Sequence, residues 1–382
     1  MDIRMYDCCF GDCFRVDSED AHHNPILVDF GIHCNSMGRV EREARFRDII
    51  ADMPEHIDFL LTHYHADHYN GIIYMMRNYP NLRFENVFIP DVWNINQAVD
   101  YIGLLLLKGL LTKSYIKNRV TIFSFLIGII RKRSIIHFVK EGSRINNQYT
   151  VLWPDFRKID LPKINGTDVG LEFDGALRVS WETVRGIALS LVRLMQEISR
   201  GDRIVYEVSR DYIYELERLE NAYIALVDDI EANGYLQYKL SSWGNNISIV
   251  FHSTDNVNRK ILFTGDVGQK YWPDIIWNQN MDTSANYYNG PCLLYDVIKV
   301  PHHGTAGYYY NFNYMSDSNT KLLIPNGNHR GWRICDAYSY TVNAVDGAAI
   351  CSNCNSCEAN GGGVCVCRKH KIVNHAGFYC DV

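Results

Sequence analysis

The histidine-rich segment at residues 60–68, LLTHYHADH, constrains the chain more than any other stretch of its sequence. His63, His65, Asp67 and His68 fall within six residues, directly after the apolar, strand-like run at 57–61. Imidazole nitrogen and carboxylate oxygen are ligands that suit Zn²⁺ or Mn²⁺. On a tight loop at a strand end, this spacing sends His63 and His65 one way and Asp67 and His68 the other. One loop could therefore serve two metal ions; a loop rich in histidine by chance is the alternative.

Three further segments carry matching groups in a fitting order. They are ILVDFG at 26–31 with Asp29, ILFTGD at 261–266 with Asp266, and VIKVPHHGT at 297–305 with His302 and His303. Together with the histidine-rich loop they resemble the metallo-β-lactamase fold, a superfamily of two-metal hydrolases. Gly11-Asp12-Cys13 and the NNIS run at 245–248 narrow the resemblance to the branch typified by the hydrolase domain of bacterial competence DNA-uptake proteins.

The resemblance implies a fold class, a ligand set and catalytic groups. The fold is α/β, an αββα sandwich with helical insertions and a Cys-rich C-terminal tail, in which Asp29 braces the metal loop. The cofactors are two divalent ions, Zn²⁺ or Mn²⁺. The first ion would take His63, His65 and Asp266, and the second Asp67, His68, Asp266 and either His302 or His303. The catalytic residues implied are Asp67, His302 and His303, where the non-ligand histidine would contact a phosphoryl oxygen or donate a proton.

Two departures from the family pattern qualify this expectation. Many enzymes of the fold carry a further histidine about twenty residues before the bridging aspartate, whereas this chain has SWGNN at 242–246. The absence of this histidine fits the competence-type branch and implies weaker metal binding at the first site. Trp332 stands where the family often has a histidine, and His329 lies three residues earlier, so a substrate role for that segment is in doubt.

The function expected is that of a two-metal phosphodiesterase, most concretely a nuclease, with nucleic acid or another phosphodiester as substrate. One alternative is hydrolysis of a small or lipid-linked phosphodiester, or of another ester or amide, because the same metal core serves all of these reactions. A metal-stabilised binding or effector module with little turnover is the second alternative.

Composition indicates an ordinary globular protein. With 47% hydrophobic and 21% charged residues over 382 positions, the chain can bury a full core. The N-terminus shows no secretory pattern, and the longest apolar runs, at 102–107 and 120–130, are shorter than the roughly 20 residues that span a bilayer. A cytoplasmic location is therefore expected.

Positive charge gathers in one segment of a chain whose net charge is −6. Residues 108–144 contain nine basic residues and a single acid, Glu141. Such a segment could neutralise phosphates along a nucleic acid, so Arg131, Lys132 and Arg133 are candidate substrate contacts, with Thr305 as a further phosphate contact. A solvated face, an interfacial membrane contact and, for Thr305, a simple turn residue are the alternatives.

The chain reads as one hydrolase domain at 1–330 with two insertions, at about 91–148 and 157–239, and a Cys-rich extension at 331–382. Strands are expected at 14–16, 26–29, 59–61, 87–89, 149–154, 240–242, 247–252 and 260–263, and helices at 40–53 and 70–78. Apolar residues at three- and four-residue spacing predict a helical hairpin in the second insertion. We expect the hairpin to pack on its own domain or to form a homodimer interface.

The C-terminal extension holds a dense cysteine cluster in a Gly- and Asn-rich context. So little apolar sequence cannot fold by burial alone, so a staple is expected. In a reducing compartment a structural zinc is favoured over disulfides, an iron–sulfur cluster or a loosely ordered tail. The candidate ligands are Cys351, Cys354, Cys357, Cys365 and Cys367.

Overall fold

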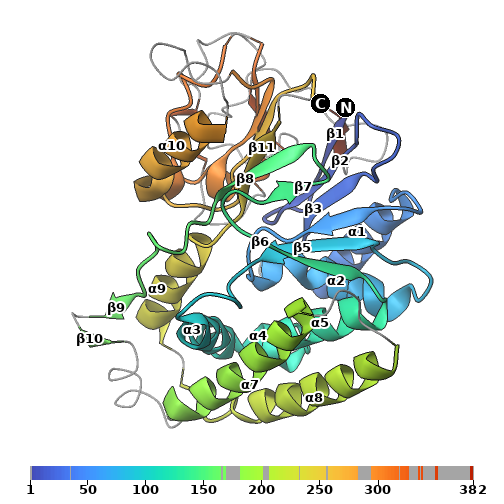
Figure 1. Cartoon of the computed structure of the whole chain (residues 1–382), viewed down its shortest axis with the longest axis vertical. Coiled ribbons are helices and arrows are strands. Elements are labelled where there is room, and N and C mark those ends of the chain that lie inside the picture. The colour runs from blue at the N-terminus through green and yellow to red at the C-terminus, as the bar shows by residue number, and fades with distance from the viewer. Residues whose placement is uncertain are drawn as a thin grey trace.

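The fold is a sandwich of two seven-stranded sheets flanked by helices (Figure 1). The computed structural model describes residues 2–34, 36–164, 167–168, 181–200, 206–231, 233–254, 257–282, 294–317, 319–326, 334–335, 337–338, 349–351 and 379–381. This α/β architecture with two mixed sheets confirms the fold class at that level.

The first sheet combines an antiparallel half with a parallel half. Its strand order is β16 (Tyr379–Asp381), β1 (Ile3–Tyr6), β2 (Cys13–Val16), β3 (Ile26–Phe30), β4 (Asp58–Leu60), β5 (Asn86–Pro90) and β6 (Ile135–Val139). Neighbours from β3 to β6 are parallel, and the other pairs are antiparallel. The carboxyl ends of β3, β4, β5 and β6 therefore share one edge of the sheet.

The second sheet has the same mixed character. Its order is β15 (Ala349–Cys351), β14 (Lys321–Ile324), β13 (Val297–Lys299), β12 (Ile261–Phe263), β11 (Val250–Ser253), β8 (Tyr149–Trp153) and β7 (Arg144–Ile145). Strands β12 to β15 are parallel, whereas β11 runs antiparallel to both β12 and β8. A separate short hairpin joins β9 (Lys163–Ile164) to β10 (Thr167–Asp168).

Alternation along the strands builds the core between the sheets. In β3, Ile26 and Val28 belong to the buried cluster that both sheets share, whereas Leu27 belongs to the cluster that includes the helices. Successive strand residues point to opposite faces of a sheet, so this division follows from the period of two. Across the interface, the rings of Phe14 and Phe263 lie 5.3 Å apart.

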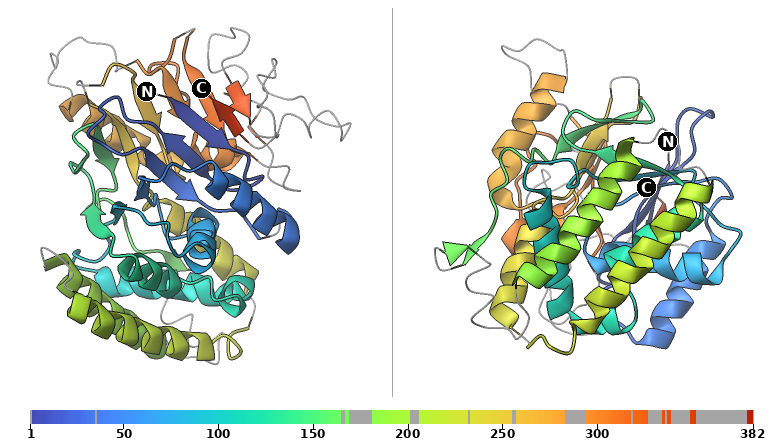
Figure 2. Two further views of the ribbon diagram at one scale, coloured as in Figure 1. Left: turned by 90° about the vertical axis from the view of Figure 1, so that its right-hand side faces the viewer. Right: turned by 60° about the horizontal axis from the view of Figure 1, so that its bottom comes forward.

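Helices cover the outer faces and one end of the sandwich (Figures 1 and 2). In the chain, α1 (Arg39–Ala51) and α2 (Ala66–Asn78) separate parallel strands of the first sheet, and α9 (Gly234–Asn245) and α10 (Trp272–Asp282) flank β11 and β12 of the second. The others form the layer at the bottom of Figure 1: α3 (Ala98–Leu111), α4 (Lys113–Lys117), α5 (Ile122–Arg131), α7 (Trp181–Arg200) and α8 (Tyr206–Ala225). Among the described residues, no helix combines the length and apolar character that crossing a bilayer requires.

The predicted helical hairpin is present as α7 and α8, which pack on α3 and α5. Val184, Leu191 and Met195 are buried at the spacing that the sequence indicated. At Gly103 of α3, a β-carbon would lie 2.7 Å from the ring of Trp181, so the two helices meet closely there. The hairpin therefore buries one face within its own chain.

Three local expectations differ from the structure. The strand expected at 240–242 is wrong, because these residues lie in α9, where Asn233 caps the helix and Leu236, Leu240 and Trp243 are buried at helical spacing. Three residues, Leu-Ser-Ser, are too few to distinguish the period of a strand from that of a helix. Helix α2 begins at Ala66 rather than at residue 70. The segment at 91–148, expected to be an insertion, contributes β6 to the first sheet and β7 to the second.

The C-terminal extension is partly described. Its strands β15 and β16 pair with β14 and β1, so the extension adds an edge strand to each sheet. The side chain of Cys351 and the whole of Cys354, Cys357, Cys365 and Cys367 lie outside the described residues, as does the expected structural zinc.

Candidate metal centre

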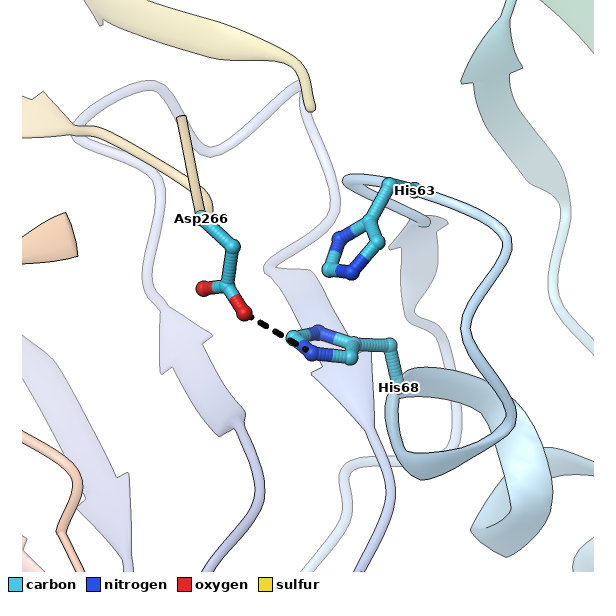
Figure 3. A group of neighbouring side chains, drawn as sticks. All are labelled: His63, His68 and Asp266. Atoms are coloured by element: carbon cyan, nitrogen blue, oxygen red, sulfur yellow. Dashed lines mark ion pairs between the residues drawn. The ribbon is translucent and has the colours of Figure 1, made fainter. Parts of the chain in front are cut away.

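The four segments singled out in the sequence meet at one edge of the sandwich. Asp29 lies at the end of β3, His63 follows β4, Asp266 follows β12, and His303 follows β13. These parallel strands all end at the same edge, and the two sheets face each other there. Figure 3 shows His63 and His68 on one side and Asp266, from the opposite sheet, facing them.

Among the described residues, three groups of three donors form within this convergence, and two of them combine ligands from both sheets; every donor in these two is buried except the partly buried Asp67. His63, His68 and Asp266 make one, and Asp67, His68 and His303 make the other; within each, one ligand atom per residue lies within 4.8 Å of the rest. Asp266 Oδ2 lies 3.4 Å from His68 Nε2 and 3.7 Å from His303 Nε2. Both groups have the donor chemistry of a divalent cation site.

Three histidines share one arrangement of their ring nitrogens. Nδ1 of His63 contacts Thr62 Oγ1 at 3.1 Å, Nδ1 of His68 contacts Asp29 Oδ2 at 2.8 Å, and Nδ1 of His303 contacts the Pro325 carbonyl at 3.2 Å. An oxygen that holds Nδ1–H leaves the lone pair on Nε2, which is how metal-binding histidines are commonly oriented. All three rings thus present Nε2 for ligation.

Asp29 is the brace that the resemblance implies for the metal loop. Its Oδ1 accepts the Thr62 backbone N–H at 2.8 Å, and its Oδ2 accepts the Thr62 hydroxyl at 2.7 Å as well as contacting His68. A β-carbon on Gly31 would lie 2.0 Å from the Asp67 carbonyl oxygen, so this backbone and the start of α2 touch. The carboxylate therefore fixes both ends of the loop between β4 and α2.

His65 lies beside the centre but outside both three-residue groups. Its ring centroid is 4.5 Å from that of His63, and a β-carbon on Gly244 would lie only 2.5 Å from its Nε2. Among the described residues, Nε2 of His63 and Nε2 of His65 are buried without a hydrogen-bond partner. A buried unpaired nitrogen costs about 1–3 kcal/mol, so both atoms are suited to ligating a cation.

The structure distinguishes the two histidines that follow β13. His303 contacts the centre, as described above. His302 contacts Thr305 Oγ1 through Nδ1 at 2.7 Å and stacks on Tyr308 with ring centroids 4.0 Å apart, and it joins neither donor group. Thr305, the expected phosphate contact, thus positions His302.

Backbone strain concentrates at these residues. Asp29, His302 and His303 have φ values of 54°, 43° and 56°, in the left-handed region that non-glycine residues seldom occupy. Each such residue costs on the order of 1–3 kcal/mol, and they cluster at functional sites. The strain supports a functional role for the turn at 302–304 and for the end of β3.

Asp12 and Lys299 complete the centre, although the sequence reasoning did not assign them a role. The buried Lys299 ammonium lies 2.5 Å from Asp12 Oδ2 and 3.2 Å from Asp266 Oδ1, and it donates to the Gly265 carbonyl at 2.9 Å. Asp12 Oδ1 is also 3.0 Å from His303 Nδ1. Both residues stand inside the quoted motifs, GDC and VIKVPHHGT, which was the signal available for finding them.

The charges in the centre shift one another's pKa values. Burial raises the pKa of Asp266, but Lys299 and His303 outweigh it and hold that pKa well below its usual range. In the same way, Lys299 and His303 overcome burial and lower the pKa of Asp12 to about 2. Burial, followed by repulsion from His68, lowers the pKa of His63 well below its usual value. The carboxylates are thus ionised and the His63 imidazole is neutral, the states that bind cations.

Several basic side chains of the segment at 108–144 have partners within the fold. Arg131 pairs with Glu217 of α8, Arg119 Nη1 lies 3.7 Å from Glu220, and Lys132 donates to the Tyr79 and Pro80 carbonyls. Arg133, another expected substrate contact, follows α5 with a φ of 59°.

The site thus defines an α/β protein whose buried His/Asp cluster could hold a metal ion. No family model, curated protein or solved structure matches the chain.

Proposed function

We propose that the chain is a two-metal hydrolase of the metallo-β-lactamase type that cleaves phosphodiester bonds. The observation that carries the proposal is the convergence of His63, His68, Asp266 and His303 from three separate segments, each imidazole with Nδ1 held and Nε2 presented. Strain at His302 and His303 is a second support.

The proposed metal ligands are His63, His65 and Asp266 for one cation and Asp67, His68, Asp266 and His303 for the other. Divalent cations bound in this way activate water as a nucleophile and offset negative charge on the reacting group. Zn²⁺ and Mn²⁺ both suit the nitrogen and oxygen donors present.

The chain's own groups position the reaction. Ser248 Oγ accepts the Asp266 backbone N–H at 3.0 Å, which fixes the loop that carries the shared carboxylate. His302, outside both donor groups and held by Thr305, is proposed to hydrogen-bond a phosphoryl oxygen or to protonate the leaving oxygen. Burial lowers the pKa of His302 to about 4, so its imidazole is neutral at pH 7, which favours the hydrogen bond to a phosphoryl oxygen over protonation of the leaving oxygen.

A substrate panel tests the proposal. Purified chain loaded with Mn²⁺ or Zn²⁺ is assayed against single- and double-stranded oligonucleotides and against small chromogenic phosphodiesters. Turnover that falls at least 100-fold in Asp266→Asn supports the proposal, and the ratio of kcat/KM values separates a nuclease from a small-molecule phosphodiesterase. A metal-loaded wild type that leaves every phosphodiester intact contradicts it.

A further inference from the structure

Helix α9 contributes a further buried acceptor to the surroundings of the metal centre. Asn245, the last residue of α9, is buried, and among the residues that the structure describes its Oδ1 has no hydrogen-bond partner. A buried oxygen left unpaired costs about 1–3 kcal/mol. His63 Nε2 and His65 Nε2 are unpaired in the same way. The three atoms indicate one shared ligand, provided that the segments carrying them meet.

The end of α9 lies directly against the histidine-rich loop. A β-carbon on Gly244, the neighbour of Asn245, would lie 2.5 Å from His65 Nε2. Shortly after Asn245, the Ile249 N–H donates to the Thr62 carbonyl at 2.8 Å. The stretch that holds Asn245 therefore contacts the loop at two points, and one of these contacts is at the unpaired nitrogen of His65.

Asn245 is also linked, through Ser248, to the strand end that carries Asp266. The Asn245 carbonyl accepts the Ser248 N–H at 3.1 Å, and Ser248 Oγ accepts the Asp266 N–H at 3.0 Å. A β-carbon on Gly265 would lie 2.6 Å from that of Ser248, so the two segments touch. The turn that follows Asn245 thus joins the loops of His65 and Asp266, two of the ligands proposed for the first cation.

Tyr308 holds the nitrogen of the Asn245 amide. Asn245 Nδ2 donates to the Tyr308 hydroxyl at 2.9 Å, and the Tyr308 ring stacks on His302 with centroids 4.0 Å apart. This hydrogen bond orients the amide, because it uses Nδ2 and leaves Oδ1 as the unpaired atom. The Asn245 side chain therefore reaches toward the turn at 302–304, which supplies the proposed ligand His303 from the second sheet.

A divalent cation suits this set of acceptors better than a water molecule does. A water molecule has fewer hydrogens than there are unpaired acceptors here, whereas a cation accepts electron pairs from all of them. The first cation has His63, His65 and Asp266 as its proposed ligands, one donor fewer than a tetrahedral site takes. Carbonyl oxygen is a donor that suits Mn²⁺.

We propose that Asn245 Oδ1 is a ligand of the cation that His63, His65 and Asp266 hold. The inference rests on the proposed function, because it assumes that the cluster binds cations. It supplies an oxygen donor from the segment at 242–246, where the resemblance led us to expect a nitrogen, and it makes the end of α9 part of the metal centre.

Titration with Mn²⁺ tests the proposal. Electron paramagnetic resonance counts the bound ions, and titration calorimetry measures their affinity, in the wild type, Asn245→Ala, Asn245→Asp and Tyr308→Phe. Tyr308→Phe is the matched control, since it removes the hydrogen bond to Nδ2 but keeps Oδ1 and the ring that stacks on His302. Asn245→Asp keeps an oxygen donor, and circular dichroism checks that each variant folds.

The proposal predicts that Asn245→Ala folds, binds one Mn²⁺ as the wild type does, and loses at least about 10-fold in affinity for the other. Asn245→Asp should restore binding of both ions, and Tyr308→Phe should match the wild type. A folded Asn245→Ala that binds both ions with wild-type affinity overturns the proposal. So does a loss in Tyr308→Phe equal to that in Asn245→Ala, because the hydrogen bond alone would then explain it.

Failure of the proposed function gives a different result. A wild type that binds Mn²⁺ in an Asn245-dependent way but hydrolyses no phosphodiester upholds the ligand and contradicts the enzyme. A wild type that binds no metal overturns both.

Discussion

Nδ1 of His68 lies 2.8 Å from Oδ2 of Asp29, and both side chains are buried. The contact joins the end of β3 to the first turn of α2 and turns His68 Nε2 toward Asp266. Burial alone would lower the pKa of His68, but Asp29 and Asp266 reverse this and raise it well above its usual value. A cation at Nε2 must therefore displace a proton that two carboxylates stabilise.

Asp29→Asn should weaken metal binding about 10- to 100-fold, the usual effect of losing the group that orients a metal-bound histidine. The amide cannot accept from Thr62 and His68 as the carboxylate does. Competition with a chromogenic chelator measures the affinity. Asp52→Asn is the matched control, since Asp52 bonds Arg4 and Tyr6 instead. An Asp29→Asn variant that binds metal with wild-type affinity would contradict this role of Asp29.

Lys299→Met should destabilise the metal-free chain by about 3–5 kcal/mol, because it leaves Asp12 and Asp266 buried without their cation. Bound divalent cations replace that positive charge, so the loss should be smaller in the metal-loaded chain. Urea unfolding with and without Mn²⁺ measures both values. The exposed-pair control Lys158→Met should lose less than about 1 kcal/mol. Equal losses with and without metal would contradict the argument.

Gly244→Ala should lower metal occupancy, since the added methyl would lie 2.5 Å from His65 Nε2 and displace the ring. Gly186→Ala in α7 meets open space, and there the better helix propensity of alanine should leave stability unchanged or raise it by up to about 1 kcal/mol. Elemental analysis and thermal unfolding report on both variants. Full occupancy in Gly244→Ala would exclude His65 as a ligand in the position described.

His302 should make the metal-free chain less stable as pH falls. The unfolded chain binds a proton at this residue near pH 6.5, whereas the folded chain does so only near pH 4. Stability is therefore lost as pH falls through that window, by about 3 kcal/mol from this group. Urea unfolding at pH 6.5 and 4 should show a correspondingly smaller loss in His302→Gln. Parallel losses in the two proteins would contradict the shift.

The sequence located the centre because its ligands lie in short motifs at strand ends. Parallel strands bring their carboxyl ends to one edge, so His63 after β4 and Asp266 after β12 could be expected to meet once two sheets were assumed. The partner of Lys299 could not be deduced in this way. Asp12 is 287 positions away along the chain, and only the packing of β13 against the N-terminal sheet shows that the two charges meet.

The sequence led to a wrong prediction of secondary structure where a short segment suits both a strand and a helix. The segment at 240–242, Leu-Ser-Ser, is too short to show a period, and Asn233 and Trp243 make it part of a helix. Such distinctions depend on tertiary contacts.

Metal content is the most direct test of the account. After loading and dialysis, elemental analysis should find about two equivalents of Zn²⁺ or Mn²⁺ more in the wild-type chain than in the His63→Ala/Asp266→Asn variant. The variant should fold, as judged by circular dichroism, so that the difference in metal content reports on this site. A folded wild type whose metal content equals that of the variant would contradict the central claim that these separated segments build a metal centre.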